Sequence, residues 1–517
     1  MIFRRSKKNQ ESSVEAPVSV ESSQEINLNE PVKDTRVRKH IWSIIGSGAG
    51  LFSDGYVNNI IGSVNTILNI LYPKEYAESS AVSNVSSIAF AGTVLGQLVF
   101  GYFADKHSRS LCLTISTLIL IVFSILAAGS WGAGGSIGGM LAALTAYRFF
   151  LGVGIGGEYP AGSVACAEAS NEVKKGSRNR WFVWFTNSMI DFGFVVAAFV
   201  PLVLLWICGM DHLDVVWRVG LGLGAIPPLS LLYIRLHLKE SEQFAKTSMR
   251  HVHIPYILVI KYYWFRLIVV SLIWFIYDFG AYSFGLYSSF ILSQIVTEDS
   301  LYESFGWNVV FNLFYIPGCL IGALFADWWG PKITLAVGVS MQAIIGFIMA
   351  GLFATLKDHV GAFVVVYGIF ASFGEFGPGD NIGLIASKTS ASPIRGHYYG
   401  ICAAVGKVGA FVGTYVFPVI IKNLGHDDPV KGYQGVFWVA SSLCVFSAVI
   451  CMAFVPRIDQ DCIVSEDDAF IEYLESKGWD TSRLGLLRKE SGFESAESAE
   501  SNESLVDQQE QDVDKKQ

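Results

Sequence analysis

Charged residues are scarce in this chain of 517 residues. Only 16% of the residues are Asp, Glu, Lys or Arg, while 52% are hydrophobic and the mean hydropathy is +0.43. A soluble globular protein carries about 25% charged residues, so the composition excludes that class. The net charge of -8 arises largely in the terminal segments. It indicates no particular partner, and we predict no nucleic-acid binding.

The motifs of enzymes and metal proteins are missing as well. The eight cysteines are scattered singly, without a Cys-x-x-Cys spacing, and many lie in apolar segments. We interpret them as small core residues and expect neither a disulfide framework nor a metal site. The sequence contains no nucleophile–base set and no nucleotide-binding loop. An enzyme is therefore not expected, and no cofactor is predicted.

Long apolar segments dominate what is present. Runs of about 20 residues, long enough to cross a bilayer as helices, recur along the chain. The predicted spans fall near residues 41–70, 83–104, 110–130, 138–169, 180–208, 214–238, 266–296, 306–326, 332–354, 360–391, 396–422 and 433–455. The fold class is therefore an all-α membrane protein with twelve transmembrane helices.

The spans group into two halves with polar segments around them. Residues 41–238 form an N-terminal six-helix half, 239–265 a polar central loop, and 266–456 a C-terminal six-helix half. The tails, 1–40 and 457–517, are polar and predicted to be disordered. Because the first 40 residues are polar, the first apolar segment is expected to be a span and not a cleaved leader.

Basic residues predict the orientation. Lys and Arg concentrate before the first span, in the second–third and fourth–fifth loops, and in the central loop. The positive-inside rule makes these segments cytoplasmic, together with both termini.

An internal repeat relates the two halves. Three pairs of acidic positions, each separated by about 220 residues, recur in corresponding spans or loops: Asp54 with Asp278, Asp105 with Asp327, and Glu158 with Glu375. Two related halves with polar groups near the middle of the membrane are typical of secondary transporters.

A glycine-rich segment, 148–160, carries the strongest functional signal. A charge in hydrocarbon is costly, so Arg148 and Glu158 are expected to face the bundle interior or a water-filled path. They lie close to three helical turns apart, which places them on one face about 15 Å from each other. A structural ion pair and a transport site are both compatible with this spacing. The glycines allow neighbouring helices to approach closely.

The loop from Gly101 to Arg109 resembles the Gly-x-x-x-Asp-Arg-x-Gly-Arg signature of the major facilitator superfamily, with Ser108 where glycine is usual. A second copy has Ala323 in place of the leading glycine, and Pro331 with Lys332 in place of the arginine. The resemblance covers roughly residues 40–456. It implies the major facilitator fold.

A narrower resemblance is to the fungal phosphate:proton symporter group. It rests on Arg148 with the following Gly-Gly-Glu158-Tyr-Pro, and on segments 274–282 and 406–409. Within the group, segments 53–58, 377–380 and 394–400 are most similar to the glycerophosphoinositol and glycerophosphocholine permeases. The resemblance implies proton-driven uptake of a glycerophosphodiester at the plasma membrane. We expect a monomer in the lipid bilayer, with protons as the coupling ion.

The predicted substrate site combines cations with hydrogen-bonding groups. Arg148 suits bidentate phosphate binding, and Lys407 suits phosphate as a point charge. An ion pair between helices is the alternative role for Lys407. The full predicted set is Arg148, Tyr159, Asn187, Trp274, Asp278, Tyr282, Asn381 and Lys407. Positions 274, 278 and 282 fall on one side of a helix. For Tyr159 and the two asparagines, helix packing is an equally open interpretation.

Carboxylates receive two different roles. Single carboxylates in apolar helices can take up and release protons, so Asp54, Glu158 and Asp278 are predicted to couple transport to protons. A purely structural hydrogen-bonding role is the alternative. The cytoplasmic loop residues are predicted to form gating ion pairs that stabilise one access state. They are Asp105, Arg109, Asp327 and Lys332.

Three more acids, Asp191, Glu375 and Asp380, exceed what an anion site needs. One interpretation is recognition of a cationic head group such as choline, helped by cation–π contacts. The other is extra proton sites or solvated helix ends. For the whole chain, an inorganic phosphate:proton symporter and a non-transporting nutrient sensor remain alternatives. A sugar porter is disfavoured because a neutral sugar gives no reason for two core cations.

Overall fold

Helices form almost all of the structure, and no strand occurs among the residues it describes. The computed structural model of the chain describes residues 34–293, 300–426, 428–482 and 484–485. Within these residues, eleven helices are long and apolar enough to cross a membrane. The first predicted span is the helix Phe52–Leu71, which is less apolar because it carries Asp54 and several Asn and Ser residues. Twelve spans are thus consistent with the structure.

The helices of the N-terminal half are α1 (Asp34–Gly48), α2 (Phe52–Leu71), α3 (Ala81–Lys106), α4 (Arg109–Ala128), α5 (Ile137–Gly157), α6 (Val164–Asn171), α7 (Arg178–Phe185), α8 (Asn187–Cys208), α9 (Leu213–Leu223) and α10 (Ile226–Leu236). Those of the C-terminal half are α12 (Tyr256–Ser293), α13 (Leu301–Leu313), α14 (Tyr315–Trp328), α15 (Pro331–Leu356), α16 (Val360–Gly374), α17 (Asp380–Lys388), α18 (Arg395–Leu424) and α19 (Pro429–Phe454). Outside the halves lie α11 (Glu242–Thr247) and α20 (Cys462–Ser476). Single turns of other helix types are η1 (Ala49–Leu51), η2 (Pro73–Ala77), η3 (Ala133–Gly135), η4 (Glu158–Ser163), η5 (Met210–His212), η6 (Glu375–Gly379) and η7 (Ser392–Ile394).

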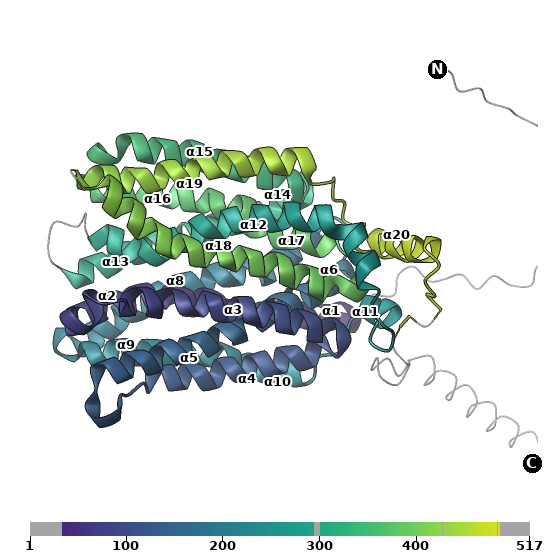
Figure 1. Cartoon of the computed structure of the whole chain (residues 1–517), viewed down its shortest axis with the longest axis horizontal. Helices are drawn as coiled ribbons and strands as arrows, with labels where there is room; N and C mark the ends of the chain where they lie inside the picture. The colour runs from purple at the N-terminus through teal and green to yellow at the C-terminus, as the bar shows by residue number, and fades with distance from the viewer. Residues whose placement is uncertain (1–33, 294–299, 427, 483, 486–517) are drawn as a thin grey trace, which may run out of the picture.

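The two halves lie side by side along their helix axes. Figure 1 shows the purple and blue helices of the N-terminal half below the green and yellow helices of the C-terminal half. Helices α3 and α2 of one half pack against α18 and α12 of the other, and α8 packs against α13. Both α11 and α20 lie at one end of the bundle, which we call the α11/α20 end.

Glycines set the closest approach between helices within the N-terminal half. A Cβ atom on Gly152 of α5 would lie 2.0 Å from the carbonyl oxygen of Ala89 on α3, and one on Gly92 of α3 would lie 2.0 Å from that of Phe149. No other residue type fits such a distance, so these backbones touch only because both positions are glycine. The predicted role of the glycine-rich segment in close helix packing is confirmed.

The internal repeat is visible in the backbone. Glu158 begins the π-turn η4, and Glu375 begins the π-turn η6, at corresponding places in the two halves. Each turn contains a proline, Pro160 or Pro378, which removes a backbone donor and disrupts the regular ladder. π-Turns inside helices often occur at functional sites.

The polar segments are more ordered than their composition predicts. Helix α12 begins at Tyr256, inside the predicted central loop, and α1 begins at Asp34, inside the predicted N-terminal tail. The predicted disordered tail from residue 457 contains α20, whose Ile463, Phe470 and Leu474 are buried. These apolar side chains recur at helical spacing, and burying their stripe stabilises the helix. The remaining tail predictions, for 1–33 and 486–517, lie outside the described residues.

Candidate functional site

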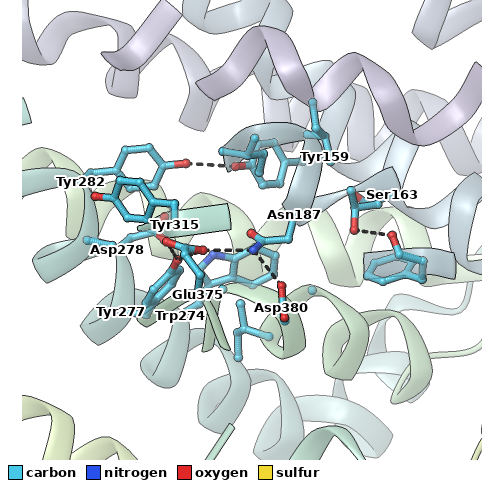
Figure 2. Close-up of a pocket in the computed structure, with 18 of the residues that line it drawn as sticks. Tyr159, Ser163, Asn187, Trp274, Tyr277, Asp278, Tyr282, Tyr315, Glu375 and Asp380 are labelled. Atoms are coloured by element: carbon cyan, nitrogen blue, oxygen red, sulfur yellow. Dashed lines mark hydrogen bonds between the residues drawn. The ribbon is translucent and has the colours of Figure 1, made fainter. Parts of the chain in front are cut away.

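A central cavity lies between the two halves. Figure 2 shows its polar side chains converging from η4 and α8 on one side and from α12, α14, η6 and α17 on the other. Its lining includes seven of the predicted site residues, namely Tyr159, Asn187, Trp274, Asp278, Tyr282, Glu375 and Asp380. The cavity volume is about 40 Å³, which suffices for only a few water molecules. The halves are therefore tightly drawn together around this site.

One pole of the cavity is formed by Tyr159, Asp278 and Tyr282, and Lys407 of α18 lies directly behind them. Its ammonium nitrogen lies 3.4 Å from the carboxylate of Asp278 and 3.7 Å from that of Asp54. It also lies 3.6 Å from the centre of the Tyr282 ring and 4.9 Å from that of Tyr159. Lys407 is buried, yet its nitrogen has no hydrogen-bond acceptor within the described structure. Such an ammonium is available to a further anionic oxygen.

Glycine on α18 makes this pole possible. A Cβ atom on Gly406 would lie 2.4 Å from the indole of Trp274 on α12. Only glycine permits this contact, which brings the next residue, Lys407, beside Asp278 on the same face of α12 as Trp274 and Tyr282. The predicted alignment of positions 274, 278 and 282 is confirmed.

Asp54 of α2 sits behind the cavity wall as a hydrogen-bond acceptor. Its carboxylate accepts from Asn58 at 2.5 Å, from the Tyr282 hydroxyl at 2.9 Å and from the Tyr159 hydroxyl. Asp54 and Asp278, the paired positions of the repeat, therefore flank Lys407 from opposite halves.

The opposite pole of the cavity is acidic. The side-chain nitrogen of Asn187 donates to Glu375 at 3.0 Å and to Asp380 at 3.0 Å, as Figure 2 shows. It also donates to Asp191 at 3.4 Å. Tyr277 donates to Glu375 at 3.0 Å. One amide has two protons for these three carboxylates, and one oxygen each of Asp191 and Asp380 has no partner among the described residues. This acidic pole can therefore accept a proton, a hydroxyl or a cation.

Two predicted substrate-binding residues, Arg148 and Asn381, lie away from the cavity. Arg148 is buried between α5, α3 and α2, where it donates to the carbonyl oxygens of Val85 at 2.7 Å and Val57 at 3.2 Å, and it does not line the cavity. Asn381 donates at 2.8 Å to the carbonyl of Gly377 and holds the π-turn η6. Neither position was distinguishable from a cavity position by sequence spacing, because both point inward.

The structural ion pair between Arg148 and Glu158, one of the two interpretations of their spacing, is not formed, and Glu158 pairs with another arginine. Arg235 of α10 donates to both carboxylate oxygens of Glu158, at 2.5 and 2.6 Å, and both side chains are fully buried. Glu158 faces α10 and α4, whereas Arg148 faces α3 and α2, so the two side chains do not meet.

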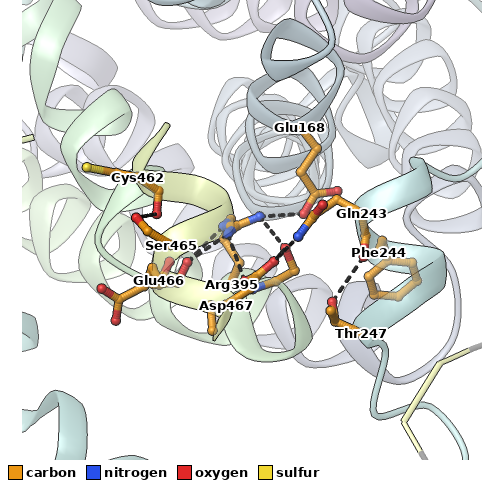
Figure 3. A network of polar contacts seen from close by, with 12 residues as sticks. Glu168, Gln243, Phe244, Thr247, Arg395, Cys462, Ser465, Glu466 and Asp467 are labelled. Carbon is orange, nitrogen blue, oxygen red and sulfur yellow. Dashed lines mark hydrogen bonds and ion pairs between the residues drawn. The ribbon is translucent and has the colours of Figure 1, made fainter. Parts of the chain in front are cut away.

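A second polar network closes the α11/α20 end. Glu168 of α6 accepts from Arg109, from Ser241, and at 2.6 Å from Arg395 of the other half. Figure 3 shows Arg395 between Glu168 and Asp467 of α20. Asp467 in turn accepts from the backbone nitrogen of Ser392 at 2.5 Å. Side chains from both halves, α20 and the segment beside α11 thus form one network.

The predicted gating residues lie at this end. Asp105 accepts from the backbone nitrogens of Gly396 at 3.0 Å and His397 at 2.8 Å, across the interface. Asp327 accepts from the backbone nitrogen of Asn179 at 3.0 Å and pairs with Arg180 at 3.5 Å. Lys332 lines a surface cleft beside Asp327, but the ion pair of Asp327 is with Arg180.

Several polar residues of both sites are not in the predicted set. They are Ser163, Tyr277, Tyr315 and Tyr399 in the cavity, and Glu168, Arg235, Arg395 and Asp467 in the buried ion pairs. A charge inside an apolar run was a usable signal for Arg235. The tyrosines carry no such signal, because tyrosines in spans are common.

Two helical halves around a polar cavity, closed at one end by ion pairs, define a membrane transporter of the major facilitator type. The fold matches a solved structure described as the MFS (major facilitator superfamily) proton:xylose symporter XylE, with a TM-score of 0.68 and 18% identity over 84% of this chain and 99% of that chain.

The sequence comparisons define the family. The model for "Sugar (and other) transporter" matches residues 42–253 and 242–461, so the chain belongs to this family. It is 52% identical over 450 residues, 86% of this chain and 84% of the relative, to the Major glycerophosphoinositol permease GIT3 of Candida albicans. It is 52% identical over 457 residues, 87% and 85% of the two chains, to the Glycerophosphocholine permease GIT4 of the same organism. The Glycerophosphoinositol transporter 1 of Saccharomyces cerevisiae is 34% identical over 450 residues, 87% and 85% of the two chains. These relatives are transporters and not enzymes, as predicted.

Proposed function

We propose that the chain is a proton-coupled symporter that imports glycerophosphodiesters through the plasma membrane. The observation that carries the proposal is the buried ammonium of Lys407, which lies between Asp54 and Asp278 without a hydrogen-bond acceptor. A phosphodiester supplies the anionic oxygens that this group lacks. The relatives named as glycerophosphodiester permeases support the choice of substrate class.

Proton coupling follows from competition at Lys407. The substrate phosphate and the Asp278 carboxylate both attract the same ammonium. A proton on Asp278 removes one competitor, so protonation and substrate binding favour each other. Asp54, held by two tyrosines and an asparagine, is the second candidate carrier. Glu158 is a weaker candidate, because it is occupied by Arg235.

The membrane potential explains why protons are needed. A glycerophosphodiester carries one negative charge at its phosphate, and moving one charge across 100 mV is worth about 2.3 kcal/mol. An inside-negative potential therefore opposes the entry of a diester whose head group is uncharged. One proton cancels that charge and adds the pH gradient, and a second proton would also use the potential.

The acidic pole is the proposed head-group subsite. Glu375, Asp380 and Asn187 lie beside the rings of Tyr277 and Tyr315. Carboxylates next to aromatic rings suit a quaternary ammonium through charge and cation–π attraction. They also suit the hydroxyl donors of an inositol ring. The phosphate at Lys407 and the head group at Glu375 then lie at opposite poles of one cavity.

Access to the site requires the halves to move. A volume of about 40 Å³ is far below the roughly 300 Å³ or more of a small-molecule site, so the cavity widens when a diester binds. We assign the α11/α20 end to the cytoplasm, because its basic loop residues fit the positive-inside rule. Its ion pairs then close the inner path while substrate enters from outside.

The test is uptake of labelled glycerophosphocholine, glycerophosphoinositol and inorganic phosphate into cells, at acid and neutral outside pH. The variants are Lys407→Met and Asp278→Asn, with Lys422→Met as the matched control, an exposed lysine on the same helix. We expect acid-stimulated uptake of a diester that both site variants lose and the control keeps. Uptake of phosphate alone would assign the chain to phosphate symport. No uptake by protein at the cell surface would favour a nutrient sensor.

A further inference from the structure

A second cavity opens on the surface at the α11/α20 end, away from the central site. Its volume is about 580 Å³, and it lies where α14 ends, α15 begins and the chain leaves α19. Figure 1 shows these three helix ends gathered at the side of the C-terminal half nearest α20. Because all three helices are membrane spans, their ends lie at the boundary between hydrocarbon and water.

The lining combines interfacial aromatics with basic groups. Trp328 is 68% exposed and Trp329 is 46% exposed, and the apolar side chains of Ile333 and Met452 are exposed beside them. Indole rings are enriched at the headgroup level of membranes. Lys332 and Arg457 also line the cleft, and neither has an ion pair within the described part of the chain. One exposed acid, Asp459, shares the lining.

We propose that this cleft binds the phosphate group of a membrane phospholipid through Lys332 and Arg457. Phosphate is the group that an unpaired lysine and arginine recognise best. The exposed indoles and the apolar side chains favour a lipid over a soluble phosphate, because acyl chains cover them and a free anion does not. This site is independent of the substrate of the central cavity.

The bound lipid favours contact between the two halves at the α11/α20 end. Asn179 of the N-terminal half lines the same cleft and makes two hydrogen bonds to the other half. Its backbone nitrogen donates to the carboxylate of Asp327, and its side-chain nitrogen donates to the backbone carbonyl oxygen of Ala326. The cleft is therefore complete only when the two halves meet here. A ligand that binds one state better than another shifts the population toward that state. Phospholipid binding thus stabilises the state closed at the α11/α20 end.

The test measures phospholipid retained by the purified full chain. Protein is reconstituted in nanodiscs of phosphatidylcholine with added phosphatidylserine, phosphatidylinositol or phosphatidylethanolamine, and lipid adducts are counted by native mass spectrometry after extraction. Lys332→Ala with Arg457→Ala is compared with Lys174→Ala with Lys477→Ala, two exposed lysines at the same end outside this cleft. Each basic residue near an anionic lipid surface contributes about fivefold in affinity, so the loss of two should weaken binding by about 25-fold.

The outcomes separate lipid from soluble anion. One adduct lost in the cleft variant, kept in the control, and not displaced by inorganic phosphate supports the proposal. Equal adducts in both double variants, or displacement by inorganic phosphate, would overturn it. If the double variant is not recovered as folded protein, the single Lys332→Gln and Arg457→Gln variants replace it. A widening of the distance between spin labels on the two halves when lipid is removed tests the effect on closure.

Discussion

Glu158 and Glu375 occupy the same position in the two halves, and their surroundings differ. Each begins a π-turn in the fourth span of its half. Glu158 is neutralised by a bidentate pair with the buried Arg235, whereas Glu375 receives only the neutral donors Asn187 and Tyr277. Glu158 thus belongs to a structural ion pair, whereas Glu375 is an acid at the cavity without a positively charged partner. The two halves share the same backbone geometry at this position, and the residues that contact each glutamate determine its role.

The largest effect on stability is expected when the ion pair between Arg235 and Glu158 is removed. Arg235→Met leaves the buried Glu158 without a positively charged partner, although Ser116 still donates to it, and this should cost about 3–5 kcal/mol of stability. The measurement is the thermal unfolding midpoint of purified protein. The double variant Arg235→Met with Glu158→Leu removes both charges and should recover most of the loss. Wild-type stability of the single variant would contradict the structural role of this pair.

Removing the acid of the other copy should affect transport instead. Glu375→Gln keeps the volume of the side chain and its acceptor oxygen, so the unfolding midpoint should stay near that of the wild type. Hydrogen bonds to charged groups contribute about 1.5–3 kcal/mol, so diester uptake should fall by about tenfold or more. Glu303→Gln, an exposed acid on α13, is the control. If Glu375→Gln lost as much stability as Arg235→Met, Glu375 would also have a mainly structural role, and this prediction would be wrong.

The repeated pair Asp105 and Asp327 extends the comparison to the closed end. Asp105 is fully buried and accepts two backbone hydrogen bonds from the other half, so Asp105→Asn should weaken closure by about 1–3 kcal/mol. The partner of Asp327, Arg180, is partly exposed, so Asp327→Asn should weaken closure by at most about 1 kcal/mol. The rate of hydrogen exchange at the first turn of α18 measures the effect of each variant on closure. A larger effect for Asp327→Asn than for Asp105→Asn would contradict this prediction.

The smallest effect is expected at the exposed end of the tail. Hydrogen bonding to Lys175, with a contribution from Arg178, holds the pKa of Asp461 below its usual range. A lowered pKa in the folded state means that this contact contributes above the usual value of about 3.9 and is lost as the pH falls through the lower folded value. Protease accessibility of residues 457–476 should therefore stay constant from neutral pH to about pH 4 and rise only below it. Asp461→Asn should abolish that rise, and release at a higher pH would point to another group.

Periodicity and length were sufficient to predict the helices and the two halves, and the resemblance added seven of the residues that line the cavity. The spacing of Trp274, Asp278 and Tyr282 needed only a regular helix, and α12 is regular there. The partner of Glu158 was not predictable, because sequence spacing does not show which neighbouring helix approaches Glu158, and the partner Arg235 lies on α10. Asp467 was hidden by the acidic composition of the tail, although its neighbours Phe470 and Leu474 follow a helical stripe.

The place of Asp467 in the network has a consequence for the synthesis of the chain. Arg395 and Glu168 meet across the halves, but the contact of Arg395 with Asp467 requires a segment that follows the last span. A ribosome releases residues 457–476 after every transmembrane helix has been made, so the contacts of Asp467 can form only after the last span has been synthesised. A nascent chain that stops at residue 456 has all its spans, but it lacks the carboxylate that Arg395 and Ser392 contact on α20.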